Sequence, residues 1–253
     1  MSTVETAVGR IGWHELLTRD VEAAKAFYGR LLGWETEVFK PGEMGYEMIK
    51  SGEQTHGGYL SLDEFAPQAP PHWIAYVVVE DADEIASKAT AGGGQVVHGP
   101  QEIPEVGTIV VLLDPQGAAI ATIQPVTEGG MTIPQGVFVW DELATTDVEA
   151  AKDFYADLFG WKTETMDMQG TPYTVFQRGE SQIAGAMTKM PQDPSPPHWT
   201  TYLGVDDIDG TAKKAGELGA TVYVEPTDIP GVGRFAIIGD PTGAVAGLYR
   251  ASA

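Results

Sequence analysis

The sequence predicts an α+β protein built from two tandem copies of one domain, and three observations support this. The stretch Gly12–Trp34 returns as Val139–Trp161 with its aromatic and acidic residues in the same order. A Pro-His-Trp motif and an Asp-Pro-x-Gly motif each occur once in either half. Each half also alternates twice between strand and helix patterns. Trp13 and Trp140 are 127 residues apart, whereas the two later motifs return after 126 residues. The difference indicates a one-residue deletion in a loop.

The first half begins with the pattern of one strand, one helix and three strands. Ile11–Thr18 is extended and partly apolar, and Asp20 is placed to cap a helix that starts at Val21. We expect Gly33 to close this helix, because glycine readily adopts the left-handed conformation found at helix ends. Three strand candidates with turn-like separators follow: Glu35–Phe39, Tyr46–Lys50 and Gly57–Leu62, with turns at Pro41–Glu43 and Ser51–Glu53.

The same pattern starts again after the proline-rich link Pro67–Pro71. An apolar strand, a helix and three further strands are expected at Trp73–Val79, Asp81–Ala91, Gln95–His98, Gly107–Leu113 and Ala118–Gln124. Since the second half repeats the first, the chain contains four such units. We predict one domain over residues 8–126, a linker over 127–133 and a second domain over 134–253.

Composition excludes several classes of function. The chain has 253 residues, 43% of them hydrophobic, which suits two domains that each bury a core. Its formal net charge of −21 would repel nucleic acid and anionic membrane surfaces. The absence of cysteine excludes disulfides, thiolate catalysis and thiolate metal sites. The sequence shows neither a signal peptide nor a run of membrane-spanning length, so we expect a cytoplasmic protein.

The order Leu-x-x-x-Asp-x-x-x-Ala-x-x-Phe-Tyr-x-x-x-Leu-Gly-Trp, read from Leu16, resembles the vicinal oxygen chelate superfamily when Asp-Pro-x-Gly follows it. That superfamily includes glyoxalase I, extradiol dioxygenases and the bleomycin- and fosfomycin-resistance proteins. The resemblance spans Gly12–Tyr249, twice, and is strongest to two-domain bacterial glyoxalase-like proteins often labelled hydroxylases. It implies two βαβββ modules per domain, which curl their strands into a cup-shaped cleft.

The resemblance also implies positions for metal ligands, because metal-using members carry His, Glu or Gln on the first and last strands of each module. Four such side chains hold a divalent ion that polarises vicinal oxygens of the substrate. The matching positions of the two copies are Trp13, Gly58, Ile74 and Ala121, then Trp140, Gly185, Thr200 and Gly247. These residues are not metal ligands, Thr200 being at most a poor one, so we expect a metal-free cleft with no cofactor.

A displaced divalent-metal site in the first domain is the alternative. Side chains alternate along a strand, so Glu15, His56 and His72 are each expected on the same face as a family ligand position two residues away. The second copy keeps Glu142 and His198 but has Ile183 in place of His56. In the competing interpretation the glutamates are structural or orienting carboxylates, and the histidines at the strand starts bond to backbone.

The clefts have the composition of small-molecule pockets. Their expected lining is aromatic and apolar around one glutamate, with these side chains as ligand contacts: Trp13, Tyr76, Trp140, Thr200, Tyr202 and Tyr249. A glutamate in such a pocket would have a raised pKa and could act as a general base, with Glu15 paired to His72 and Glu142 to His198. Alternatively, each glutamate accepts a hydrogen bond from backbone or from a tryptophan indole.

Several neighbouring residues are expected to be structural. Trp73 and Trp199 should face away from the cleft and pack against helices. His14 and Asp141 should also point away, at the surface or between modules, and His98 should be solvated.

Three hypotheses for function follow. In the first, the chain is a glyoxalase-like or lyase-like enzyme acting on a small oxygenated molecule, with a metal-dependent lyase or dioxygenase at the displaced site as a variant. In the second, it is a protein that binds a flat hydrophobic ligand. In the third, one copy is functional and the other is structural. The duplication supplies both halves of a pseudo-dimer, so a monomer suffices. Specificity is expected in the loops Thr36–Gly45 and Thr163–Thr171, where no motif names the substrate.

Overall fold

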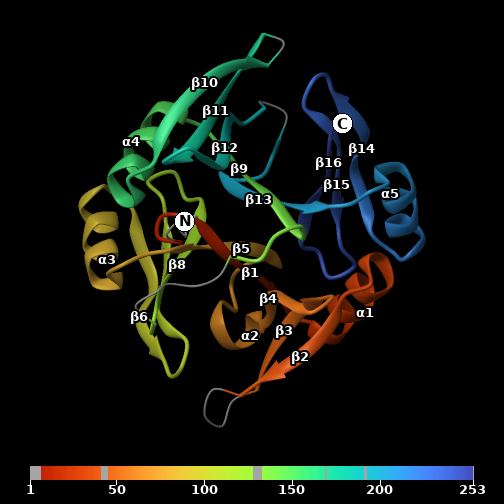
Figure 1. Cartoon of the computed structure of the whole chain (residues 1–253), viewed down its shortest axis with the longest axis horizontal. Helices are drawn as coiled ribbons and strands as arrows, with labels where there is room; N and C mark the ends of the chain where they lie inside the picture. The colour runs from red at the N-terminus through yellow and green to blue at the C-terminus, as the bar shows by residue number, and fades with distance from the viewer. Residues whose placement is uncertain (1–6, 41–44, 128–132, 169, 191–192, 253) are drawn as a thin grey trace, which may run out of the picture. The chain divides into compact units, whose positions relative to one another are not determined.

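A computed structural model describes residues 7–40, 45–127, 133–168, 170–190 and 193–252. Within them the chain runs through four βαβββ modules in succession (Figure 1). The turn predicted at Pro41–Glu43 and most of the predicted linker, residues 128–132, lie outside the described residues.

The first repeat contains modules 1 and 2. Module 1 comprises β1 (Ile11–Thr18), α1 (Val21–Leu32), β2 (Glu35–Phe39), β3 (Tyr46–Ser51) and β4 (Gln54–Ser61). A short helix that the sequence did not predict, α2 (Leu62–Phe65), leads on from β4. Module 2 comprises β5 (His72–Val78), α3 (Ala82–Ala91), β6 (Gln95–Ile103), β7 (Gly107–Leu113) and β8 (Ala119–Pro125).

The second repeat contains modules 3 and 4. Module 3 comprises β9 (Phe138–Thr145), α4 (Val148–Phe159), β10 (Lys162–Met168), β11 (Thr171–Arg178) and β12 (Ser181–Thr188). Module 4 comprises β13 (His198–Gly204), α5 (Ile208–Glu217), β14 (Thr221–Ile229), β15 (Gly233–Gly239) and β16 (Val245–Ala251). Much of the two segments predicted as specificity loops is therefore strand, in β2 and β10.

The predicted α+β fold of tandem βαβββ modules is confirmed. Each repeat forms one mixed eight-stranded sheet, in the order β2-β3-β4-β1-β5-β8-β7-β6 and its equivalent β10-β11-β12-β9-β13-β16-β15-β14. The first strand of module 1 pairs in parallel with the last, and the remaining neighbours within the module pair as antiparallel hairpins. The predicted helix ends are confirmed: the Asp20 side chain accepts a hydrogen bond from Ala23 N, and Gly33 closes α1 in the left-handed region at φ 74°.

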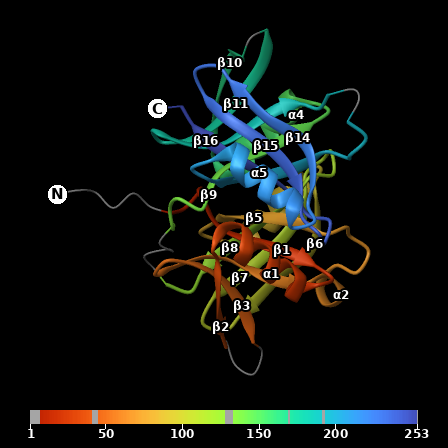
Figure 2. The same ribbon diagram turned by 90° about the vertical axis from the view of Figure 1, so that its right-hand side faces the viewer.

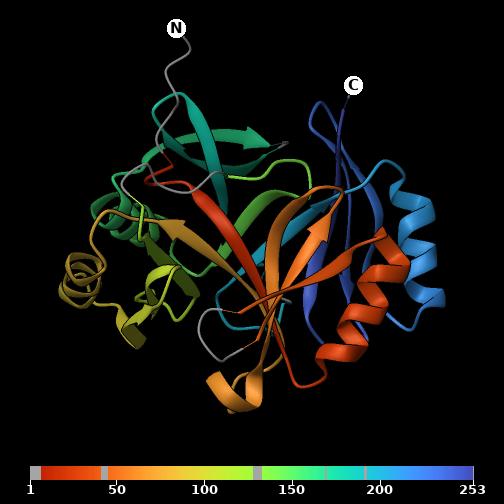
Figure 3. The same cartoon turned by 60° about the horizontal axis from the view of Figure 1, so that its bottom comes forward.

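By their contacts, the modules group into two compact units that do not follow the two repeats. The first unit combines modules 2 and 3 and comprises the described parts of Met1–Trp13, Ala75–Ile133 and Trp140–Trp199. The second unit combines modules 1 and 4 and comprises His14–Ile74, Pro134–Val139 and Thr200–Ala253. Within the second unit α1 lies beside α5 (Figure 3), and α5 packs against β14 and β15 (Figure 2).

Each unit has a core that joins its two modules, and a buried hydrogen-bond chain runs through it. In the second unit Trp73 Nε1 donates to the Tyr28 hydroxyl at 3.2 Å, and this hydroxyl donates to Asp240 Oδ2 at 3.1 Å. Burial, together with the Asp240 charge, raises the pKa of Tyr28 well above its usual value. The Phe-Tyr motif of one repeat thus binds the Asp-Pro-x-Gly motif of the other.

The first unit contains the reciprocal chain. Trp199 Nε1 donates to the Tyr155 hydroxyl at 3.0 Å, which donates to Asp114 Oδ2 at 3.0 Å. The predicted packing of Trp73 and Trp199 against the helices is confirmed, since each lies in a hydrophobic core with residues of α1 or α4. The motifs that carry the repeat therefore hold modules of different repeats together.

Candidate functional site

The second unit holds a glutamate–tyrosine pair on the face of its strands opposite to the core. Leu16 of β1 is fully buried in the core, so its neighbour Glu15 points to the other face, where it is 7% exposed. Tyr46 of β3 donates its hydroxyl hydrogen bond to Glu15 Oε1 at 2.6 Å. Gly58 of β4 is the partner of Glu15 in the strand register. A Cβ atom on Gly58 would overlap the Tyr46 hydroxyl, so the pair forms only because this residue is glycine.

The first unit holds the equivalent pair, whose tyrosine also accepts a hydrogen bond from a tryptophan. Trp140 Nε1 donates to the Tyr173 hydroxyl at 2.8 Å, and Tyr173 donates to Glu142 Oε2 at 2.8 Å. Gly185, the register partner of Glu142, again lacks the Cβ that would overlap the tyrosine hydroxyl. An indole N–H can only donate, so the tyrosine must accept from it, and its own proton is directed to the carboxylate.

These two tyrosines were missed by the sequence reasoning. The internal repeat contained the signal, because Tyr46 and Tyr173 are separated by the same offset as Trp13 and Trp140, and as Glu15 and Glu142. The missing information was that a residue in the third strand of the module, β3 or β11, reaches across a glycine of the fourth strand to the first strand.

The two predicted histidines each bond to backbone near the start of a strand. His72 Nδ1 lies 2.8 Å from Pro70 O, and His198 Nδ1 lies 2.9 Å from Pro196 O. A carbonyl oxygen can only accept, so Nδ1 is the donor in both contacts. Burial lowers the pKa of His72, against the opposing effect of the Pro70 carbonyl. In the described part of the chain no hydrogen bond or ion pair joins either histidine to the glutamate of its own repeat.

Strand alternation predicted that His56 lies on the same face as Gly58, but β4 is irregular at His56. Ile49 pairs with Gly57 and Lys50 with Thr55, so His56 is the extra residue of a β-bulge, where regular alternation is lost. It is buried, its Nδ1 has no hydrogen-bond partner among the residues that the structure describes, and desolvation lowers its pKa. Its counterpart Ile183 lies in the hydrophobic core of the first unit.

The described residues contain no group of three or more His, Asp or Glu side chains that could hold a metal ion, and Glu15, His56 and His72 are among them. The family's own ligand positions do not fit a metal either. The space next to Gly58 and Gly185 is taken by a tyrosine hydroxyl, and a Cβ on Gly247 would overlap the Tyr202 ring. The other positions carry indole, alkyl or hydroxyl groups, which do not make up a metal-binding site.

The remaining predicted ligand contacts differ in how accessible they are. Tyr76, Thr200 and Tyr202 are buried, whereas Trp13, Trp140 and Tyr249 are half-buried. The Tyr249 hydroxyl donates to Val232 O at 3.0 Å.

Two of the residues expected at the surface or between modules are buried. His14 is 5% exposed and stacks on Phe138 of module 3 with ring centroids 4.1 Å apart, which is the contact between modules that was one of the two expectations. Asp141 is also buried, at 3% exposure. His98 is partly exposed and contacts Gln101 through Nε2.

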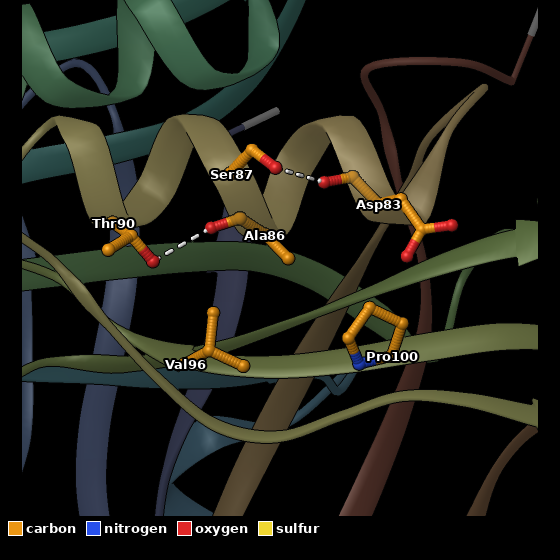
Figure 4. Close-up of a pocket in the computed structure, with 6 residues that line it drawn as sticks. All are labelled: Asp83, Ala86, Ser87, Thr90, Val96 and Pro100. Carbon is orange, nitrogen blue, oxygen red and sulfur yellow. Dashed lines mark hydrogen bonds between the residues drawn. The ribbon is translucent and has the colours of Figure 1, made fainter.

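A shallow hollow of about 530 Å³ lies on the first unit between α3 and β6 (Figure 4). Its lining is Asp83, Ala86, Ser87, Thr90, Val96 and Pro100. The hydroxyls of Ser87 and Thr90 donate to backbone carbonyls of α3, so they are already used within the helix. None of the predicted site residues lines this hollow.

Both repeats match the sequence pattern of the Glyoxalase/Bleomycin resistance protein/Dioxygenase superfamily, over residues 10–122 and 137–246. The chain belongs to this superfamily. It is 36% identical to a Mycobacterium tuberculosis protein named "Putative glyoxylase CFP32", over 96% of this chain and 95% of that protein. It is 32% identical to the anthracycline biosynthesis protein DnrV of Streptomyces peucetius, over 94% and 92% of the two chains.

Solved structures share the fold at much lower identity. The Mn(II)-bound glyoxalase from Novosphingobium aromaticivorans superposes with a TM-score of 0.63 at 17% identity, covering 96% of this chain and 82% of that one. The 2,3-dioxygenase LapB from Pseudomonas sp. KL28 gives 0.62 at 13% identity, covering 96% and 92%. Among the described residues, none of the helices is long and apolar enough to cross a membrane.

Proposed function

We propose that this chain binds a small oxygenated aromatic molecule against Glu15 and Glu142, without a metal ion. The observation that carries the proposal is the glutamate–tyrosine pair, which occurs in both units with the same geometry over a glycine. Both units have a carboxylate, buried at Glu15 and half-buried at Glu142, together with a hydroxyl that stabilises it.

The chemistry of the pair suits recognition of a hydroxylated ring. An ionised carboxylate can accept several hydrogen bonds, so the tyrosine leaves acceptor capacity for a ligand hydroxyl. Half-buried Trp140 lies two residues before Glu142, on the same strand face, and offers an aromatic surface. The name of the Streptomyces relative, which refers to anthracycline biosynthesis, supports a polycyclic aromatic ligand.

A second candidate is proton transfer next to a carbonyl group of the bound molecule, with Glu15 or Glu142 as the base. The Mycobacterium relative named as a glyoxylase favours this candidate. It requires the same glutamates but adds turnover to binding, so one set of variants tests both.

The test is titration of a dihydroxyanthraquinone into the purified chain, with quenching of the emission of its six tryptophans as the readout. We expect saturable binding that survives treatment with a chelator. Glu15→Gln and Glu142→Gln should each weaken one site by roughly tenfold or more. The matched control is Glu53→Gln, which removes an exposed carboxylate in the β3–β4 turn.

Unchanged binding in both glutamine variants would contradict the proposal. Loss of binding on metal removal, with recovery on adding a divalent ion, would also contradict it. Turnover of a neutral hydroxyketone that disappears in Glu15→Gln or Glu142→Gln would establish the second candidate.

A further inference from the structure

We propose that the hollow between α3 and β6 binds an alkylguanidinium group, supplied by a small molecule or by an arginine side chain of a partner. The proposal goes beyond the proposed function, because none of the residues assigned to the ligand sites lines the hollow. It rests on the internal repeat. The equivalent place in module 4 is occupied by an arginine of this chain, and module 2 lacks that arginine.

In module 4 a guanidinium group is held between a helix and a neighbouring strand. Arg234 of β15 donates from Nε and Nη2 to the two carboxylate oxygens of Asp209 in the first turn of α5, at 2.9 and 2.8 Å. Its Nη1 donates to Asp228 of β14 at 2.8 Å. The guanidinium lowers the pKa of Asp209, and the two carboxylates raise the pKa of Arg234. A planar, forked group held by one carboxylate on two sides is the arrangement that distinguishes arginine from lysine.

Module 2 keeps both carboxylates but not the arginine. Asp83 is the second residue of α3, the place that the first of the two aspartates has in α5. Glu102 of β6 is the register partner of Thr108 of β7, and these are the places of the second aspartate and of the arginine. Glu102 follows two residues after Pro100, which lines the hollow. Module 2 therefore has the two acceptors without the group that they hold in module 4.

No cation of the described residues takes the place of the missing arginine. Lys88 is the only lysine or arginine within residues 72–125, and it pairs with Glu84 at 2.6 Å. Among the described residues, no hydrogen bond or ion pair joins the carboxylate of Asp83 or Glu102 to a lysine or an arginine, Arg10 included. Two like charges beside a hollow, on a chain of formal charge −21, attract a cation from outside.

The hollow has room for the guanidinium and for the alkyl chain that carries it. Its volume is about 530 Å³, with Asp83 and Pro100 at one end and Thr90 and Val96 at the other (Figure 4). By the rise per residue of a helix, these ends are roughly 10 Å apart. The guanidinium lies at the Asp83 end, and the alkyl chain lies along the apolar side chains of Ala86 and Val96.

The test is titration of butylguanidinium into the isotope-labelled full chain, with the backbone amide shifts of α3 and β6 as the readout. The matched control is butylurea, which has nearly the same shape but no charge. We expect saturable shifts with a dissociation constant of roughly a few millimolar, and no saturable shifts from butylurea. Asp83→Asn and Glu102→Gln should each weaken binding by about threefold to tenfold. Glu53→Gln removes an exposed carboxylate elsewhere and should leave binding unchanged.

Two variants exchange the residue that distinguishes the modules. Thr108→Arg should occupy the site from within the chain and abolish the shifts in α3 and β6. Arg234→Thr should open a second site, with new shifts in α5 and β14 when butylguanidinium is added. A blocked peptide with one arginine among alanines distinguishes the two sources. Tighter binding of the peptide than of butylguanidinium assigns the site to a partner's arginine, and the reverse order assigns it to a small molecule.

Equal shifts from butylurea and butylguanidinium would overturn the proposal, as would shifts that persist unchanged in Thr108→Arg. The absence of saturable shifts in α3 and β6 of the wild-type chain would overturn it too. None of these results affects the proposed function, which is measured by tryptophan quenching with a different ligand. The wild-type titration and Thr108→Arg decide the question even where Arg234→Thr fails to fold.

Discussion

The two repeats agree at the glutamate–tyrosine pair and differ around it. Glu15 with Tyr46 and Glu142 with Tyr173 keep the same bond across the same glycine. The bulge residue of the fourth strand, by contrast, is His56 in one copy and core Ile183 in the other. The pair is thus retained although the residue two positions before its glycine changes from histidine to isoleucine.

A second difference concerns the Asp-Pro-x-Gly turns. Gln116 in the first turn binds the start of α4, accepting from Asp147 N at 2.7 Å and donating to Asp147 O at 2.8 Å. Thr242 in the second turn instead donates from its hydroxyl to Asp240 Oδ1 at 2.7 Å, within its own turn. The aspartate of the turn and its tyrosine partner are kept in both copies, so this bond joins the modules in both units, and Gln116 adds a further link in the first unit.

The largest expected effect comes from removing that aspartate. Asp240 accepts from Tyr28 and, through Oδ1, from the backbone of Thr242, Gly243 and Ala244. Asp240→Ala should lower the free energy of unfolding by about 3 kcal/mol in urea denaturation, and Asp114→Ala by a similar amount. The control Asp63→Ala removes an exposed carboxylate and should change it by less than about 0.5 kcal/mol. A small change in the free energy of unfolding in only one of the two variants would show that the tyrosine–aspartate bond contributes differently to the two units.

The glycines beneath the tyrosines come next. Gly58→Ala and Gly185→Ala should each destabilise the chain by about 2 kcal/mol, because the new methyl group displaces the hydroxyl from the glutamate. Both should also weaken ligand binding. Gly216→Ala in α5, where a Cβ meets nothing within 4 Å, is the control and should stabilise the helix. Unchanged binding in the first two variants would count against the pair as the ligand contact.

Tyr46→Phe and Tyr173→Phe should each weaken ligand binding, because each removes the hydroxyl that donates to the glutamate of its site. We expect about 1 kcal/mol of lost binding free energy in each variant, measured by quenching. Unchanged affinity in both variants would show that the tyrosine hydroxyl does not contribute to the ligand contact.

The smallest effect is expected from exchanging the bulge residue. Burial lowers the pKa of His56 and of His72 below the usual 6.5, so the unfolded chain takes up protons that the folded chain does not. The free energy of unfolding should therefore fall as the pH drops from 8 to 5, with the change centred near and below pH 6.5. His56→Ile, which copies Ile183, should make that slope shallower, because it removes one of the two groups whose pKa folding lowers. An identical slope in the variant would show that His56 is protonated equally in both states.

Much of the fold followed from local pattern. The spacing of Asp20 and Gly33 predicted both ends of α1, because capping depends on residues next to one another in the chain. The face that carries Glu15 followed from strand alternation, and the structure agrees because β1 has no irregularity in its pairing with β4. His56 broke the same rule, since a bulge depends on the partner strand and leaves no clear mark in the sequence.

The sequence by itself determined the duplication, the βαβββ modules, the superfamily and the two glutamates that lie at the candidate sites. All of these depend on residue identity and short-range periodicity. Only the tertiary structure decided which modules share a core, that Tyr28 binds Asp240 and Tyr155 binds Asp114, and that a tyrosine fills the space over each glycine. Those contacts join residues far apart in the chain, and their formation depends on packing, which periodicity does not encode.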